Sequence, residues 1–265
     1  MHWQATPDAS IDPLSGAVAA VTAPRTGASY ESAAPIRNRL IGALSPAELA
    51  RLRPHLEPVQ LEQRTTLYDV DEVPIRYVYF PETCVVSLLN TLHRGGAVEV
   101  GTVGCEGMAG LPVFLSDNES PLRAIVQIPG MAARIEVEHF LRATAGGQLH
   151  VLLLRYTQAF LTQVAQTAAC NAAHLVEERC ARWLLTTHDR VEGDSFPLTH
   201  EFLAFMLGVR RAGVTVAMQA LQDRHLVRYG RGWVSIVDRA GLEAASCECY
   251  ATVHAHYERL LPRGG

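Results

Sequence analysis

Two adjacent arginines, Arg210 and Arg211, are the residues best suited to bind a polyanion in this chain. At helical spacing, Ala212, Thr215 and Gln219 share their face. Guanidinium groups form forked hydrogen bonds to phosphates and to guanine edges. Because a helix N-terminus is already positive, two cations there are unfavourable unless an anion lies nearby. The pattern therefore indicates a surface that binds nucleic acid.

The segment around these arginines predicts two short helices joined by a tight turn. Thr199 can cap the first helix and is counted with Arg210, Arg211, Ala212, Thr215 and Gln219 among the predicted DNA-binding residues. Gly208 can end this helix in a left-handed conformation. The predicted buried positions of the second helix are Val214, Ala217 or Met218, and Leu221. Small and β-branched residues around a glycine turn are typical of a helix-turn-helix.

A predicted hairpin follows, because residues 226–237 alternate in polarity on both sides of the turn at 229–232. It can place Arg228 or Arg231 against a phosphate, which completes a winged helix-turn-helix. Residues 197–239 hold six arginines and three acids, a local charge of +3, whereas the whole chain carries −4. All 23 basic residues are arginine. The chain is therefore no polycation, and DNA must be bound by a local patch.

The cysteines are the second set of residues that could do chemistry. They are Cys84, Cys105, Cys170, Cys180, Cys247 and Cys249. Cys247 and Cys249 could bind a metal, but no second pair completes four ligands, so no metal site is predicted and their role stays open. His150, His174 and His188 lack ligand spacing and are expected at the surface or at helix caps. Reduced, buried thiols in a cytoplasmic protein are expected.

The first half of the chain predicts a β-rich domain. Residues 1–35 are poor in large side chains and are expected to be disordered. Ser45 caps a short helix that starts at Pro46, with Glu48 completing a capping box. Beyond Val59 the period becomes two, with strands expected at residues 76–80, 85–89, 97–100 and 123–128. These short strands favour a small antiparallel barrel or jelly roll.

A long helix is expected next, because residues 148–192 contain neither glycine nor proline. Its heptad positions are Leu154, Leu161, Ala168 and Leu175, with Ala165 and Ala172 between them. This seam favours a twofold partner helix, although packing within its own domain is the alternative. After the wing, Asp238 is expected to cap one last helix, from Arg239 to about Leu261.

Over residues 36–240 the chain resembles bacterial transcription regulators of the cyclic-AMP receptor/Fnr (Crp/Fnr) family. The most specific match is residues 198–226, above all the run Leu207-Gly-Val-Arg-Arg. The resemblance implies that Arg211 contacts a base at the start of the recognition helix. The cyclic-AMP receptor has an acid at the position of Ala212 and an arginine at that of Val216. The family's operator is therefore not assumed, and Thr215 and Gln219 are the substitute base readers.

The resemblance also implies where an effector would bind. The family's nucleotide-phosphate site is a Gly-Glu segment followed by an Arg-Ser pair, which places Glu106 and Arg123 as effector-binding residues. Ala124 replaces the serine, so a cyclic nucleotide is not favoured. The first cysteine is Cys84, which argues against the N-terminal iron–sulfur cluster of the Fnr branch. Haem bound through an isolated histidine or cysteine stays open, but nothing in the sequence selects a ligand, so no cofactor is identified.

The predicted fold is α+β: an N-terminal antiparallel β jelly-roll (cyclic-nucleotide-binding-like) domain, a long dimerisation helix and a C-terminal winged helix-turn-helix. The predicted segments are a tail (1–35), a sensor domain (36–146), a dimerisation helix (147–175), a DNA-binding domain (176–238) and a C-terminal helix (239–265). Expected partners are an operator in double-stranded DNA, a second copy of the chain and RNA polymerase, with no membrane. The expected function is a dimeric, sequence-specific transcription regulator.

Two other functions stay open at this level. A winged helix can bind a protein partner instead of DNA, and weak salt dependence of binding would distinguish that case. A cupin-like metal enzyme would need clustered ligands, but His93, Glu99 and Glu106 are scattered in the sequence. No catalytic residue is therefore predicted, and the chain is expected not to be an enzyme.

Overall fold

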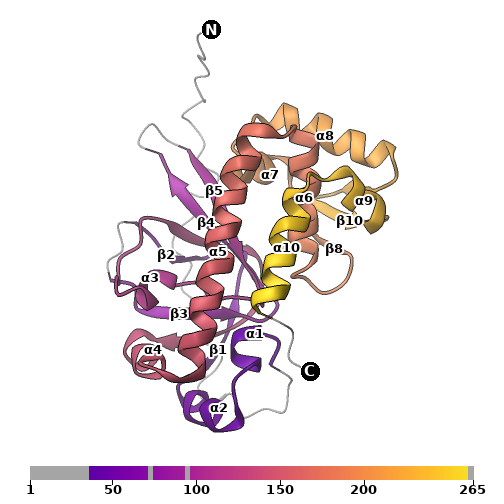
Figure 1. Ribbon diagram of the computed structural model, residues 1–265. Helices are drawn as coiled ribbons and strands as arrows, with labels where there is room; N and C mark the ends of the chain where they lie inside the picture. The colour runs from indigo at the N-terminus through magenta and orange to yellow at the C-terminus, as the bar shows by residue number, and fades with distance from the viewer. Residues whose placement is uncertain (1–35, 71–73, 93–95, 262–265) are drawn as a thin grey trace.

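The computed structural model describes residues 36–70, 74–92 and 96–261. The tail predicted at residues 1–35 lies outside the described residues. Figure 1 shows a β domain, a long helix α5 that runs along it, and a smaller C-terminal unit near the far end of that helix. None of the described helices combines the length and apolar character needed to cross a bilayer.

The β domain consists of two antiparallel sheets, as the period-two pattern predicts. One has the order β1 (Glu57–Leu61), β7 (Gly130–Glu136), β3 (Tyr77–Pro81). The other has the order β2 (Thr66–Tyr68), β6 (Arg123–Ile128), β4 (Val85–Thr91), β5 (Ala97–Val103). The four predicted strands are confirmed as β3 to β6. Val59, Phe80 and Val126 are fully buried between the sheets.

Short helices cover the ends of the β domain. They are α1 (Arg39–Gly42), α2 (Pro46–Leu52), the 3-10 helix η1 (Arg53–His55), α3 (Leu111–Phe114) and α4 (Val137–Thr144). Ser45 caps α2 as predicted, accepting from the Glu48 N–H. The predicted capping box is wrong, because the Glu48 carboxylate accepts from the Gln148 N–H at 2.9 Å. Gly146 at the N-cap of the next helix has no side chain to satisfy that amide, so Glu48 does so.

Helix α5 (Gly147–Ala173) has one buried and one exposed face. Leu153 and Tyr156 are among its residues buried against the β domain. Leu154 and Leu161 on the other face are 51% and 57% exposed. The helix ends before Leu175, and α6 (Val176–His188) starts a new direction. The predicted seam is therefore an apolar surface stripe.

The C-terminal unit contains the predicted winged helix-turn-helix. Its elements are β8 (Ser195–Pro197), α7 (His200–Leu207), α8 (Arg211–Asp223), β9 (Val227–Gly230) and β10 (Trp233–Ile236), with sheet order β8-β10-β9. Val85 and Ile125 of the β domain belong to the same hydrophobic core as Trp183 and Leu203. The unit therefore packs on the outer face of the β4–β6 sheet.

The single C-terminal helix predicted from Arg239 is wrong, because the structure has two. Asp238 caps α9 (Arg239–Ala245) by accepting from the Gly241 N–H, and α10 (Cys249–Leu260) follows a break at residues 246–248. Helix α9 packs on α6, whereas α10 packs along α5 (Figure 1). The chain must change direction between these two surfaces, which accounts for the break.

Candidate nucleic-acid interface

The turn between α7 and α8 has the local geometry that the sequence predicts. Thr199 Oγ1 caps α7 by accepting from the Phe202 N–H at 3.1 Å. Gly208 ends α7 with φ +62°, a left-handed conformation that glycine adopts without strain. A Cβ at this position would lie 3.1 Å from a Val98 methyl group on β5. The turn therefore rests directly on the β domain.

The outer face of α8 presents the predicted DNA-binding residues. Arg210, Arg211, Ala212, Thr215 and Gln219 are all exposed. Within the described part of the chain, no hydrogen bond or ion pair engages the side chain of Arg210 or Arg211. Thr215 Oγ1 donates to the Arg211 carbonyl, and Gln219 Nε2 donates to Asp223 at 2.7 Å. The two arginines are thus the groups most available to an external anion.

The wing is a tight hairpin next to this face. Arg231 (φ +52°) and Gly232 (φ +79°) form its two-residue turn, a combination typical of a type I′ turn. Arg228 on β9 and Arg231 at the tip are exposed. The hairpin thus presents two guanidinium groups that could contact a phosphate backbone.

A stacked pair joins the wing to α7. The rings of His200 and Tyr229 stack with centroids 4.2 Å apart, and His200 Nδ1 lies 3.1 Å from Thr215 Oγ1. Burial, and then the charge of Arg211, lower the pKa of His200 below its ordinary value. The imidazole is therefore neutral near pH 7 and adds no charge to the arginine surface.

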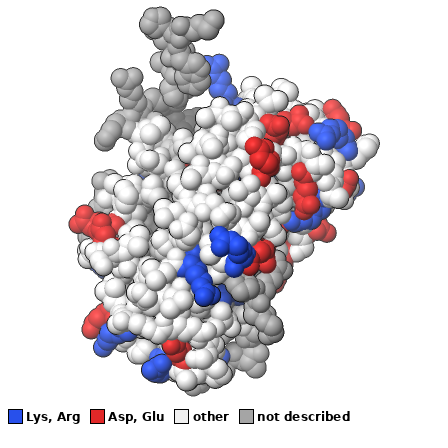
Figure 2. All heavy atoms as spheres, in the orientation of Figure 1, with Lys and Arg blue, Asp and Glu red and all other residues white. Residues whose placement is uncertain are grey.

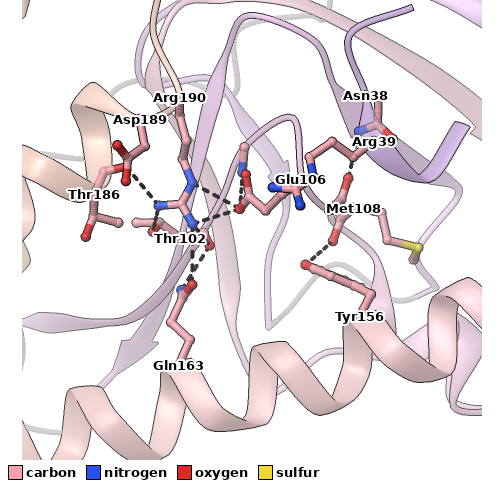
Figure 3. A network of polar contacts seen from close by, with 12 residues as sticks. Asn38, Arg39, Thr102, Glu106, Met108, Tyr156, Gln163, Thr186, Asp189 and Arg190 are labelled. Atoms are coloured by element: carbon pink, nitrogen blue, oxygen red, sulfur yellow. Dashed lines mark hydrogen bonds and ion pairs between the residues drawn. The ribbon is translucent and has the colours of Figure 1, made fainter. Parts of the chain in front are cut away.

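The predicted effector residue Glu106 lies at a buried contact between the β domain and the residues after α6. Arg190 donates to Glu106 Oε1 from Nη2 at 2.7 Å and from Nε at 3.0 Å (Figure 3). Arg190 Nη1 also donates to Thr102 Oγ1 at 2.7 Å, and Glu106 accepts from the Gly104 N–H. Both charged side chains are only 7% exposed. The ion pair therefore holds the two parts of the chain together.

The pKa shifts of this pair agree with its geometry. Burial alone would raise the pKa of Glu106, but the charge and hydrogen bonds of Arg190 outweigh burial and lower it. Burial would likewise lower the pKa of Arg190, and Glu106 raises it well above its ordinary value. Both groups are therefore ionised at neutral pH.

The second predicted effector residue, Arg123, lies elsewhere. It forms an ion pair with Asp69 at 2.6 Å and lies opposite Leu89 of β4. Glu106 follows the C-terminal end of β5, where Val103 pairs with Val86 of β4. Three strand residues span about 10 Å. Glu106 and Arg123 thus have separate partners at opposite ends of the sheet, an arrangement that does not fit one nucleotide phosphate.

A cavity of about 430 Å³ lies beside the Glu106–Arg190 pair. Arg39 from α1 and Tyr257 from α10 line it, together with Glu106 and Arg190. Arg39 Nη1 donates to Glu258 at 2.9 Å. Segments from both ends of the described chain thus line this open cavity.

The cysteines and one histidine depart from the sequence prediction. Cys247 and Cys249 lie close to Cys170 and His174. The metal-binding atoms of these four side chains all lie within 4.8 Å of one another. His174 is the C-cap residue of α5, as a capping role predicts, but its ring also faces the thiols. The ligands that the Cys247–Cys249 pair needs are thus supplied by a distant segment, since Cys170 lies 77 positions before Cys247. No local spacing could have indicated them.

The carboxylates considered for a metal enzyme have protein partners. Glu99 accepts from Ser87 Oγ at 2.6 Å and from Trp183 Nε1 at 3.1 Å, and Glu106 accepts from Arg190. His93 lies outside the described residues. Glu99 and Glu106 thus accept hydrogen bonds that connect the β domain to residues in and after α6.

Comparison with known proteins connects this geometry to a family. Residues 178–245 match the family profile of the Crp-like helix-turn-helix domain. The chain carries a Crp-like helix-turn-helix domain. No curated protein matches its sequence.

Solved structures extend the likeness beyond the helix-turn-helix domain to most of the chain. FixK2 from Bradyrhizobium japonicum superposes with a TM-score of 0.62 at 19% identity, covering 72% of this chain and 98% of its own. The c-di-GMP responsive global regulator CLP of Xanthomonas campestris gives 0.55 at 16% identity, covering 72% and 99%. A CooA variant from Carboxydothermus hydrogenoformans gives 0.54 at 11% identity, covering 80% and 96%. The chain thus shares the fold of these Crp/Fnr-type proteins.

Proposed function

We propose that this Crp-like chain is a dimeric, sequence-specific DNA-binding transcription regulator whose β domain controls DNA binding. The observation that carries the proposal is the outer face of α8. There Arg210 and Arg211 are exposed at a helix N-terminus, next to the wing arginines Arg228 and Arg231. A recognition helix presents its N-terminal residues to the major groove while nearby cations bind phosphates.

The exposed stripe of α5 supports the dimer. Val151, Leu154 and Leu161 are 46%, 51% and 57% exposed, and small alanines continue the stripe toward the end of the helix. On the face shown in Figure 2, the surface over α5 is largely uncharged. A second α5 would cover this stripe and place two α8 helices on half-sites about 10 bp apart.

The contact between Arg190 and Glu106 supports control by the β domain. It joins the loop after β5 to the residues that follow α6, and Gly208 of the helix-turn-helix rests against β5. A change in the β domain would therefore act directly on the DNA-binding unit. The buried ion pair is one point through which such a change would pass.

The test is selection of bound duplexes from a random DNA pool, followed by competition binding with Arg211→Ala. A bidentate arginine–guanine contact is worth about 1–3 kcal/mol. We therefore expect the variant to lose about 10–100-fold in its preference for the selected sequence over random DNA. Thr215→Ala and Gln219→Ala on the same face test the two substitute base readers.

Arg142→Ala is the matched control, since Arg142 is an exposed arginine on α4. It removes the same charge far from α8 and should leave the preference unchanged. Equal preference in wild type and Arg211→Ala would contradict the assignment of α8. Binding that does not weaken as salt rises would instead favour a protein partner.

The dimer is tested with Leu161→Glu, which places a charge on the exposed stripe without touching the core. We expect wild type to sediment as a dimer and Leu161→Glu as a monomer that retains its fold. Loss of the second half-site should weaken operator binding by at least about 100-fold. Arg155→Glu, also exposed on α5, controls for added negative charge. A monomeric wild type at micromolar concentration would contradict the dimer.

A further inference from the structure

Four side chains with metal-binding atoms meet where the end of α5 lies against the start of α10. Cys170 is on the last turn of α5, and His174 is its C-cap residue. Cys247 lies in the break between α9 and α10, and Cys249 is the first residue of α10. The three cysteines are buried and form a small cluster separate from the two main cores. Two segments far apart in sequence thus contribute two ligands each.

The distances fit a single tetrahedral ion. Cys170 Sγ and Cys247 Sγ are 3.5 Å apart, and Cys249 Sγ and His174 Nδ1 are also 3.5 Å apart. All four ligand atoms lie within 4.8 Å of one another. With Zn–S bonds of about 2.3 Å and Zn–N bonds of about 2.0 Å, the edges of a tetrahedral site are about 3.5–3.8 Å. Only small movements would therefore complete the coordination.

Groups outside these four residues complete the arrangement. His174 Nε2 lies 3.2 Å from a carboxylate oxygen of Glu248, which leaves Nδ1 to face the thiols. A carboxylate partner on the second ring nitrogen is typical of metal-bound histidine. Gln166 Nε2 donates to Cys249 Sγ at 3.1 Å, a hydrogen bond that favours a thiolate.

The local charges favour an anionic centre. Three thiolates and one divalent ion carry a net charge of −1. Arg179 and Arg182 lie close enough to Cys170 to interact electrostatically with a negative charge there. The Nε atoms of both arginines are buried and have no hydrogen-bond partner among the described residues. These cations balance the charge that three thiolates would bring.

We propose that Cys170, His174, Cys247 and Cys249 form a zinc site that fastens the C-terminal helix α10 to the dimerisation helix α5. Three soft thiolates and one imidazole in tetrahedral array select zinc over the oxygen-preferring cations magnesium and calcium. A four-iron cluster is a poorer fit, because each ligand would bind a different iron and the ligand atoms would have to lie farther apart. With four protein ligands the site is closed, so it is structural rather than catalytic.

The site has a mechanical consequence for the cavity beside Arg190. Tyr257 and Glu258 on α10 line that cavity, and Glu258 accepts from Arg39 of α1. A zinc ion at the start of α10 would fix the helix that forms one wall. Removal of the ion should therefore loosen α10 before the rest of the fold.

The first test is the zinc content of the full-length protein, purified under reducing conditions without chelators. Wild type should hold about one zinc per chain, and Cys170→Ser, His174→Ala and Cys249→Ser should hold almost none. Cys84→Ser and Cys180→Ser are matched controls, because both thiols are buried outside the cluster. They should keep the zinc of wild type. Equal zinc content in wild type and the ligand variants would overturn the proposal.

Wild type also allows a test that does not depend on ligand variants folding. Metal-depleted protein titrated with Co²⁺ should show thiolate-to-cobalt charge transfer and the visible bands of tetrahedral cobalt, and Zn²⁺ should displace them. Absence of these bands would overturn the proposal. So would a Cys170–Cys247 disulfide that persists in excess reductant and blocks cobalt binding.

Glu248→Gln separates metal binding from a purely structural role of the cluster. It leaves all four ligands in place but weakens the partner of His174 Nε2. We expect one zinc per chain with an affinity about 10–100-fold lower, measured by competition with a chromophoric chelator. Chelation of wild type should also speed proteolysis within α10, whereas Cys249→Ser should be cleaved quickly with or without chelator. Unchanged affinity in Glu248→Gln together with chelator-insensitive proteolysis of wild type would contradict the role of zinc at α10.

Discussion

Arginine serves opposite purposes in two regions of this molecule. On α8 and the wing, Arg210, Arg211, Arg228 and Arg231 are exposed. After α6, Arg190 is 7% exposed and donates to Glu106 and Thr102, among other acceptors. The chain has no lysine, so residue type cannot separate the two uses.

The difference shows how to assign a role to a charge. A buried charge must be satisfied within the protein, since burying it unpaired costs several kcal/mol. An exposed charge at a helix N-terminus gains little from its own chain and is available to an external anion. Arg190 is therefore a structural residue between two domains, whereas the α8 arginines are candidates for binding.

The largest effect is expected when the buried contact is broken by Arg190→Ala. Glu106 would stay buried without its cation, so the free energy of unfolding should fall by about 3–5 kcal/mol. Urea denaturation measures this change. Arg142→Ala removes an exposed arginine paired with Glu138 at 3.4 Å and should change stability by less than about 0.5 kcal/mol. If the two substitutions lowered the free energy of unfolding equally, the proposed difference in role between buried and exposed arginines would be wrong.

A second buried charge at the same junction sharpens the comparison through pH. Burial raises the pKa of Glu99 to about 7, although Ser87, Arg182, Trp183 and Arg190 lower it in part. Since the folded pKa lies above the unfolded one, the folded state holds the proton more tightly. The free energy of unfolding contributed by this group is therefore greatest below about pH 4 and falls as pH rises to about 7, by on the order of 3 kcal/mol.

Glu99→Gln keeps the shape of the side chain but removes its titratable carboxyl group. The measurement is the free energy of unfolding of wild type and of Glu99→Gln at several pH values between 4 and 8, and the difference between the two proteins is followed as a function of pH. Wild type should lose stability relative to the variant as pH rises. A difference that stays constant with pH would show that Glu99 is ionised throughout and that its burial is compensated.

The smallest effect is expected at the wing, with Arg231→Asn. Asparagine tolerates the left-handed conformation at φ +52°, so the turn should keep its shape while it loses a charge. If Arg231 contacts a phosphate, affinity should fall about equally for all sequences. The slope of log affinity against log salt should decrease by about 0.9 per subunit. A loss confined to the selected operator would instead make Arg231 a base reader.

Local chemistry made much of the fold predictable. The caps at Ser45, Thr199 and Asp238, the left-handed Gly208 and the hairpin around Arg231 each depend on a few neighbouring residues, and all were found. Period-two and heptad patterns likewise gave the β domain and the long helix. Such features follow from sequence because their causes lie within one helical turn or one hairpin.

Contacts between distant segments were not predictable in the same way. Glu106 and Arg190 are 84 positions apart, and Cys170 and Cys247 are 77 apart. Glu48 was expected to cap its own helix, but it accepts from Gln148, 100 positions away. In each case several partners were chemically suitable, and only the packing of the helices on the sheets selected one.

The contact between Gly208 and Val98 has a consequence for the rate of switching. The Val98 side chain of strand β5 packs directly against the backbone of the helix-turn-helix at this point, and a methyl group on Gly208 would lie 3.1 Å from a Val98 methyl group. Close-packed surfaces of this kind exchange between discrete arrangements rather than deform gradually. Movement of β5 and reorientation of α8 should therefore occur as one kinetic event, with a single relaxation rate whether it is observed from the β domain or from the helix-turn-helix.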